Sequence, residues 1–420
     1  MKRMKFNLII LCSIIFFVSL SLYSQHFEED QLTSEVFEKK KVEAGGAFAL
    51  QLQMLNHDAD SALIPLGKGI NLPTANFNLD AYLAPGIKVN LVTYLSSRHH
   101  NDAWVKGGYL LIDEMPFFKS QGINTLMEYL TLKAGVMEIN YGDAHFRRSD
   151  NGNVTQNPFV GNYIMDAFTT APSLEILYRR SGIIAMAAIT NGTLRPDLVR
   201  FSSTTNTYTA YNIIDELGFY GKVGYDKQFN DNLRLRLTVS GYHMGQHHFG
   251  SLYNGDRAGS RYYLIMNRQA NSSTDVDISS NAFSGRWGPG VTNKDNSLMV
   301  NLFSKFRGLE AFASYESVTG TSLSGNEFKF GQVAAEALYR FGPDEQFYAG
   351  VRYNMVNGDT NTAVDGDQSV NRVQVGAGWF ILESTVLKLE YVNQTYTDFI
   401  SQYGADAGFN GLMVEAAISF

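Results

Sequence analysis

The chain has 420 residues, a formal net charge of −7 and one cysteine, with 38 glycines, 28 phenylalanines and 23 tyrosines but only nine prolines. This acidic balance argues against a nucleic-acid partner, which would need clustered basic charge. The sequence has no apolar run of eighteen or more residues beyond position 24, which excludes a bundle of membrane-spanning helices.

The N-terminus has the pattern of a secretory signal peptide. Met1-Lys-Arg-Met-Lys5 is basic, Phe6 to Leu22 is almost uncharged, and Ser24 precedes the expected cleavage site. A retained transmembrane helix is the competing interpretation, although the run is close to the lower limit of about 17 residues for crossing a bilayer. Bulky Leu11 before Cys12 does not fit a lipoprotein site. We therefore predict a signal peptide over residues 1–24.

Removal of this segment changes the composition of the mature chain. The segment holds three of the 34 basic residues and none of the 41 acidic ones, so 31 basic residues and a net charge of −10 remain. The only cysteine is also lost, which excludes disulfides, thiol catalysis and thiolate metal sites. Residues 25–42 are charged and predict a periplasmic lead-in, too short for the plug domain of a TonB-dependent receptor.

From residue 43 onward the sequence alternates between apolar and polar residues, as in the strands of a membrane barrel. In the first strand Ala44, Phe48 and Leu50 share one face, while Gln51 and Gln53 share the other. Connections alternate strictly between short and long. The long ones lie near 57–75, 96–103, 140–172, 191–215, 243–295, 319–327, 358–368 and 397–407.

This alternation predicts an all-β fold, a transmembrane antiparallel up-and-down barrel of sixteen strands over residues 43–420, with both termini at the short-turn end. One short-side connection, near 115–122, is longer and is expected to contain a short helix. Tyr262 to Met266 offers an additional hairpin inside the longest loop, so eighteen strands are the alternative.

When the more apolar face of each strand is assigned to lipid, the other face carries many charges. The basic lumen residues are then Lys88, Lys133, Arg179, Lys222, Arg234, Arg236, Lys305, Arg340, Arg352, Arg372 and Lys388. The acidic ones are Glu43, Asp80, Glu175, Asp226, Glu310, Glu316, Glu336, Glu390 and Glu415. On the outer face, aromatic residues near strand ends are typical of an interfacial girdle: Tyr225, Phe341, Trp379 and Tyr391.

The last strand ends on an aromatic residue. Leu412, Val414, Ala416 and Ile418 share one face with the terminal Phe420. This pattern resembles the C-terminal recognition signal of barrels assembled into the bacterial outer membrane. The resemblance implies an outer-membrane location, contact with outer-membrane lipid, and recognition of this strand by the barrel-assembly machinery.

The stretch between Asn140 and Pro172 is about thirty residues without periodicity, which is unusual unless it is functional. Hairpin counting makes it the third external loop, the one that folds into the lumen in general porins. We therefore predict a pore constriction formed by Asp143, His145, Arg147, Arg148 and Asp150. The alternative is that Arg147 and Arg148 pin the loop to the wall, with Asp143 and Asp150 neutralising them.

Three segments carry a family resemblance: AWVKGGYLLID from residue 103, LTLKAGVMEINYGDAHFRRSDNG from 130, and NPFVGNYIMDAFTT from 157. They resemble the phosphate-selective porin superfamily, the O and P porins, over roughly residues 76–195. The resemblance implies a sixteen-stranded trimeric pore for small anions or other small solutes. That family relies on an arginine ladder and a lysine cluster, whereas acids are interleaved here, so general diffusion of small polar solutes is the favoured function.

Other interpretations are weaker. His99-His100 and His247-His248 lack accompanying carboxylates, and the calcium-like run from Asn357 to Asp367 is interrupted by Ala363, so no metal or cofactor is predicted. Ser96, Ser97 and His99 do not define a catalytic triad, and we expect no enzyme activity. The remaining alternative is an interaction barrel of a secretion or adhesion assembly that docks a partner through the 243–295 loop.

Overall fold

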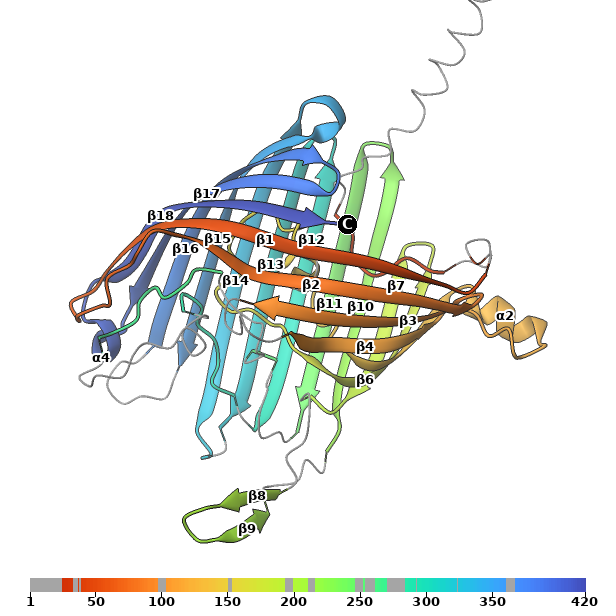
Figure 1. Cartoon of the computed structure of the whole chain (residues 1–420), viewed down its shortest axis with the longest axis horizontal. Helices are drawn as coiled ribbons and strands as arrows, with labels where there is room; N and C mark the ends of the chain where they lie inside the picture. The colour runs from red at the N-terminus through yellow and green to blue at the C-terminus, as the bar shows by residue number, and fades with distance from the viewer. Residues whose placement is uncertain are drawn as a thin grey trace, which may run out of the picture.

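The computed structural model describes the chain from Gln25 onward with gaps. The described residues are 25–32, 37, 39–96, 103–149, 153–192, 199–210, 216–245, 252–253, 261–269, 284–291, 293–322, 324–359 and 367–420. The predicted signal peptide lies outside them. Sixteen antiparallel strands form a closed barrel (Figure 1), which confirms the predicted fold and excludes the eighteen-stranded alternative.

The barrel strands are β1 (Lys41–Asp58), β2 (Gly69–Ala84), β3 (Ile87–Ser96), β4 (Trp104–Ile112), β5 (Leu130–Glu138), β6 (Thr170–Arg180), β7 (Ile183–Thr190), β10 (Gly218–Asn230), β11 (Leu233–Met244), β12 (Lys294–Phe306), β13 (Leu309–Thr321), β14 (Glu327–Phe341), β15 (Phe347–Asp359), β16 (Asp367–Leu382), β17 (Thr385–Thr397) and β18 (Ala407–Ser419). A separate hairpin, β8 (Val199–Ser202) and β9 (Thr207–Ala210), stands away from the wall in both figures of the whole chain.

Little of the described chain is helical. The helix expected near 115–122 is α2 (Gln121–Met127), which begins later and lies between β4 and β5. A single turn, α4 (Ile400–Tyr403), precedes β18, and the 3-10 turn η3 (Ala144–Arg147) follows β5. No helix among the described residues is long and apolar enough to cross a membrane.

The barrel closes where β1 pairs with β18. The register places Ala47 opposite Ser419, and beyond it Gly46 and Phe420 exchange both backbone hydrogen bonds, at 2.8 and 2.9 Å. The terminal residue therefore completes the ladder. Its ring leaves no room for a side chain at Gly46, because a Cβ there would lie 2.9 Å from the Phe420 Cζ atom.

Side chains alternate along the wall with a period of two, and the polarity is the reverse of a soluble protein. In β13, Leu309 and Tyr315 are about half exposed on the outside, whereas Glu310 and Glu316 are fully buried inside. Near the short-turn end, stacked aromatic rings run across neighbouring strands from Tyr339 through Phe341 and Phe347 to Trp379. An apolar outer surface with an aromatic band is the surface that a bilayer requires.

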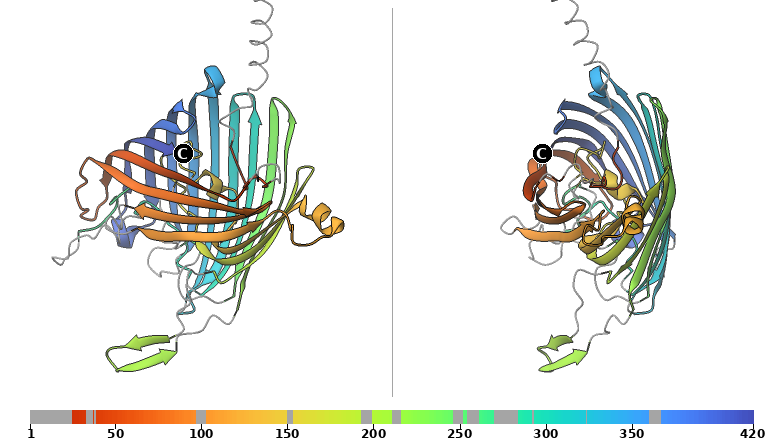
Figure 2. Two further views of the ribbon diagram at one scale, coloured as in Figure 1. Left: turned by 45° about the vertical axis from the view of Figure 1, so that its right-hand side comes forward. Right: turned by 90° about the vertical axis from the view of Figure 1, so that its right-hand side faces the viewer.

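Three segments lie inside the wall: residues 25–32, the described residues of 139–169 (139–149 and 153–169, called the 139–169 segment below), and the described parts of residues 245–293 (Figure 2). Residues 139–169 follow β5 and form the third long connection. Residues 25–32, which belong to the expected lead-in, thus lie within the barrel. Tyr262 to Met266 also lies inside and forms no strand, so this part of the longest loop is an interior packing element.

Substitution of Gly378 in β16 tests how the wall accommodates the interior. The ring of Tyr348 lies over Gly378, and from there its hydroxyl donates to the Pro158 carbonyl in the 139–169 segment at 3.0 Å. Gly378→Ala would place a Cβ in the ring, so we expect it to destabilise the barrel by about 1–3 kcal/mol. The loss of the heat-modifiable folded form on an SDS gel measures this.

Gly331→Ala in β14 is the matched control, because a Cβ there meets only the Glu316 carbonyl oxygen at 3.9 Å. Equal melting temperatures for the two variants would contradict the proposed role of Gly378.

Candidate functional site: the barrel lumen

The 139–169 segment is irregular backbone that is held by wall side chains. Its N–H groups donate to inward-facing acceptors: Asp143 to Asn301 (2.9 Å), Val160 to Glu390 (2.8 Å), Ile164 to Asn354 (2.7 Å) and Met165 to Gln332 (3.0 Å). Unpaired backbone groups are costly at membrane depth, so non-helical chain persists there only when protein or water satisfies it. These wall side chains therefore determine where the segment can lie.

Arg147 is buried between two wall glutamates. Its Nη1 and Nη2 atoms lie 2.9 Å from Glu310 and 2.8 Å from Glu336, and Nη1 also donates to the Gln25 side chain at 2.8 Å. Both carboxylates hold a second arginine, since Glu310 contacts Arg340 and Glu336 contacts Arg352. Arg147 thus ties the segment to β13 and β14.

Arg148 makes its contacts within the same segment. Its guanidinium binds Asp166 through Nε (2.8 Å) and Nη2 (2.7 Å) and lies over the ring of Phe168, 3.9 Å from the centroid. A two-point contact of this kind fixes the orientation of the guanidinium. Arg148 thereby links the start of the segment to its end at Asp166.

Asp143 pairs with β10 and β11 of the wall rather than with the two arginines. Its carboxylate lies 3.0 Å from Lys222 Nζ and 2.8 Å from Arg236 Nε, and it accepts from the Thr238 hydroxyl at 2.7 Å. Burial alone would raise the pKa of Asp143, but Lys222 and Arg236 hold it well below its usual range. The expectation that Asp143 neutralises Arg147 and Arg148 is therefore wrong.

The remaining predicted constriction residues are His145 and Asp150. His145 is buried, with Nδ1 at 2.6 Å from Glu138 and Nε2 at 3.1 Å from Asn140. Asp150 lies outside the described residues. Asp143, His145, Arg147 and Arg148 thus lie in one segment, each with polar partners.

The predicted lumen residues fall into two groups. Five lie near residues 25–32, on β3, β5, β6 and β11: Lys88, Lys133, Arg179, Arg234 and Arg236. Three lie farther round the wall. Arg352 donates to the Gly161 carbonyl at 2.7 Å, Arg372 to the Gly285 carbonyl at 2.8 Å, and Lys388 to the Val154 carbonyl at 2.7 Å.

The described part of the 245–293 segment contacts the barrel wall. The sequence did not predict these contacts. Arg261 binds Glu415 at 2.9 Å, the Tyr262 hydroxyl donates to Glu390 at 2.6 Å, and Tyr263 exchanges two hydrogen bonds with Gln53. The run Arg261-Tyr-Tyr263 is more aromatic than a solvated loop requires, and this is the signal that indicates an interior position. Together with the 139–169 segment it fills the half of the barrel lined by β11 to β18.

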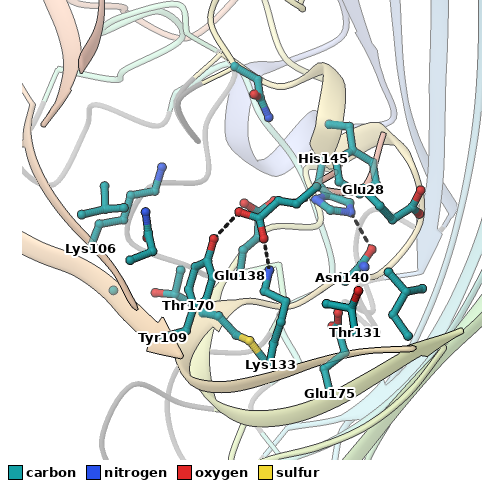
Figure 3. A pocket seen from close by; sticks show the side chains of 18 of the residues that line it. Glu28, Lys106, Tyr109, Thr131, Lys133, Glu138, Asn140, His145, Thr170 and Glu175 are labelled. Carbon is teal, nitrogen blue, oxygen red and sulfur yellow. Dashed lines mark hydrogen bonds and ion pairs between the residues drawn. The ribbon is translucent and has the colours of Figure 1, made fainter. Parts of the chain in front are cut away.

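The other half of the lumen contains a cavity of about 440 Å³. It is bounded by β2 to β6, by residues 26–30 and by the start of the 139–169 segment. Figure 3 shows Lys106, Tyr109, Lys133, Glu138 and Glu175 around it. Both charge signs and several hydroxyl and amide groups line this space, so the cavity is polar.

No group of three or more His, Cys, Asp or Glu side chains in the described ranges is arranged to hold a metal ion. His99-His100, His247-His248, Ser97 and most of the calcium-like run lie outside those ranges. Asn357 and Asp359 belong to β15, where Asp359 pairs with Asp367 of β16 as ordinary ladder residues.

No protein-family model matches the sequence, and no curated protein matches it either. Solved structures share the fold. An anion-selective porin from Comamonas acidovorans superposes with a TM-score of 0.52 at 10% identity, covering 91% of this chain and 100% of that one. OmpT of Vibrio cholerae, in its trimer form, gives 0.51 at 10% identity, with 91% and 100% coverage. OprB of Pseudomonas putida gives 0.50 at 9% identity, with 94% and 100% coverage.

Removal of Arg147 tests its role as an anchor. Arg147→Ala leaves Glu310 and Glu336 buried with one arginine each, and breaking a buried pair costs about 3–5 kcal/mol. We expect the folded form to melt at a markedly lower temperature on heated SDS gels. Arg307→Ala, in an exposed turn, is the control. Similar melting of both variants would show that Arg147 does not hold the segment.

The lowered pKa of Asp143 predicts a specific pH dependence of the stability of the folded barrel. A carboxylate with a lowered pKa stabilises the folded state above its ordinary value of 3.8 and loses that contribution as the pH falls toward the folded-state pKa. The difference in melting temperature between wild type and Asp143→Asn should therefore be largest near neutral pH and shrink below about pH 4. Asp344→Asn, at an exposed turn, should show no such trend. A constant difference across pH 3–7 would contradict the pairing.

Proposed function

We propose that this protein is a porin of the bacterial outer membrane, through which small polar solutes diffuse passively. It reaches the membrane with the help of a cleaved signal peptide over residues 1–24 and of recognition of the Phe420 strand by the barrel-assembly machinery. The observation that carries the proposal is the closed sixteen-stranded wall, with apolar residues outside and charged residues inside. A ring of this size encloses an aqueous channel in barrels of known function.

The path that we propose runs along β2 to β6. There the lumen keeps a polar cavity, whereas the 139–169 segment and the described part of the 245–293 segment occupy the opposite half. Asp143, His145, Arg147 and Arg148 narrow the channel by holding the 139–169 segment in place. Their polar groups already pair with neighbouring side chains. The constriction thus acts by size more than by the charge of the two arginines.

Phosphate selectivity, as in the O and P porins, has less support. Arginine binds phosphate through its fork of donors. The forks of Arg147, Arg148 and Arg352 are already occupied by carboxylates or backbone carbonyls. General diffusion of small polar solutes and anions is the better match. The V. cholerae relative in fold forms a trimer, and we propose a homotrimer here.

An interaction barrel within an envelope assembly is the second candidate. The observation that favours it is the β8–β9 hairpin, which projects from the long-loop end with Phe201 about half exposed. The described residues of the 245–293 segment that pack inside the barrel add no support to it. A folded barrel without any channel activity would favour this candidate over the porin.

Planar bilayers with unequal potassium chloride on the two sides test the porin. We expect stepwise conductance from the folded protein. Lys106→Glu, on the cavity wall, should shift the reversal potential toward cation selectivity, because it reverses a charge beside the path. Lys329→Glu makes the same change at an exposed position of β14 and should shift it less. Absence of conductance steps would contradict the porin function. Equal shifts of the reversal potential in the two variants would contradict the proposed path along β2 to β6.

A further inference from the structure

Residues 25–32 lie in the lumen as a strap between two parts of the wall, β10 and β11 on one side and β3 and β5 on the other. Glu28 reaches Arg236 on β11, with its two oxygens 2.6 and 2.9 Å from Nη2 and Nη1, and lies 3.6 Å from Lys222 on β10. The next residue, Glu29, contacts other strands, because the chain bends at Glu28. Its carboxylate lies 3.2 Å from Lys133 on β5 and 3.8 Å from Lys88 on β3.

The strap is also held by apolar and backbone contacts. Phe27 is buried against the rings of Phe146 and Phe303, with centroids 5.9 and 5.3 Å apart, and the Arg236 guanidinium lies 4.3 Å from its centroid. Arg234 donates to the Gln25 carbonyl at 2.8 Å, and Arg179 donates to the Glu29 carbonyl at 2.7 Å. Residues from six strands, β3, β5, β6, β10, β11 and β12, therefore define one position for the strap.

The strap separates two cavities. His26, Phe27, Glu28 and Asp30 line the 440 Å³ lumen cavity, and the same four residues line a second cavity of about 320 Å³. The second cavity is bounded by the turn between β6 and β7 and by Asp226 and Arg234, which places it at the short-turn end of the barrel. Displacement of the strap would join the two cavities into one path toward that end.

The carboxylates of Glu28 and Glu29 in the strap lie among lysine and arginine side chains of the wall. On one wall Lys222, Arg234 and Arg236 meet two resident acids, Asp143 and Asp226, so Glu28 supplies the third carboxylate. On the other wall Lys88 is shared with Asp80, and the Tyr109 hydroxyl donates to Glu29. Burial would raise the pKa of Glu29, but Lys133 and Lys88 lower it to about 2, so the group is a carboxylate at neutral pH.

We propose that Glu28 and Glu29 are built-in ligands of a carboxylate-binding site, and that the lumen takes solutes bearing two carboxylates when the strap is displaced. The donors that would hold the solute are those that now hold the strap: Arg236 and Lys222 on one wall, and Lys133, Lys88 and Tyr109 on the other. A forked guanidinium and a hydroxyl beside an ammonium are the groups that bind carboxylates in proteins. The transport part of this inference rests on the proposed porin, whereas the binding site does not.

Calorimetric titration of succinate into the folded barrel in detergent tests the site without any need for channel activity. A site occupied by its own chain for 90% of the time has an apparent affinity about tenfold below its intrinsic one. The variant E28Q/E29Q keeps Phe27 and removes both carboxylates, so we expect it to bind succinate at least about tenfold more tightly than wild type. Asp30→Asn is the matched control, since Asp30 is an exposed neighbouring acid, and it should behave as wild type.

A third variant locates the bound succinate. Adding Lys133→Met to E28Q/E29Q removes a cation that contacts Glu29 and should abolish most of the gain in affinity. An unchanged affinity in this triple variant would overturn the proposal. So would equal succinate binding by wild type, D30N and E28Q/E29Q, or tighter binding of inorganic phosphate than of succinate by E28Q/E29Q.

Planar bilayers then separate this inference from the porin itself. If the strap obstructs the path, E28Q/E29Q conducts more than wild type, and millimolar succinate reduces its current. Succinate binding by E28Q/E29Q without conductance in any variant would leave the site in place and overturn only the porin. If wild type and E28Q/E29Q had the same conductance and the same block by succinate, the strap would not compete with solute for the site.

Discussion

Most of the charged side chains described inside this barrel pair with a partner that is also inside it. The wall satisfies its own backbone by closing, and the seam between β1 and β18 is completed by the hydrogen bonds of Gly46 and Phe420. The interior segments have no such ladder. Their irregular backbone and their charges are satisfied by inward side chains, because an unpaired group in a low-dielectric space is costly. Most of the lumen architecture follows from this requirement.

The requirement explains why the lumen is asymmetric. Glutamates and amides on β12 to β17, such as Glu336, Asn354 and Glu390, accept hydrogen bonds from the 139–169 segment. Glu415 on β18 is shared by Lys388 and Arg261, so it also links the wall to the 245–293 segment. Fewer side chains of β2 to β6 bind the two interior segments. The polar cavity therefore lies on that side of the lumen. The distribution of acceptors along the wall thus decides which half of the barrel is filled.

The same logic connects the constriction to the strap. Arg236 serves both, because its guanidinium binds Asp143 of the 139–169 segment and Glu28 of the strap at once. Gln25 likewise accepts from Arg147. The two interior elements therefore share donors and are mechanically linked. A change that releases the strap leaves Arg236 with Asp143 and Asp226, so the constriction retains its main ion pair.

The wall of this protein was predictable, whereas the pairing of side chains inside it was not. Alternation with a period of two identifies the inward face of each strand, as for Glu310 and Arg352, and the spacing of turn residues such as Pro85-Gly86 separates short turns from long loops. Both signals are local, so a single sequence contains them. The partners of Arg147, in contrast, lie 163 and 189 residues away, and Glu28 is 208 residues from Arg236. Which acid meets which base depends on how closure of the ring brings distant strands face to face across the lumen, and only the tertiary structure settles that.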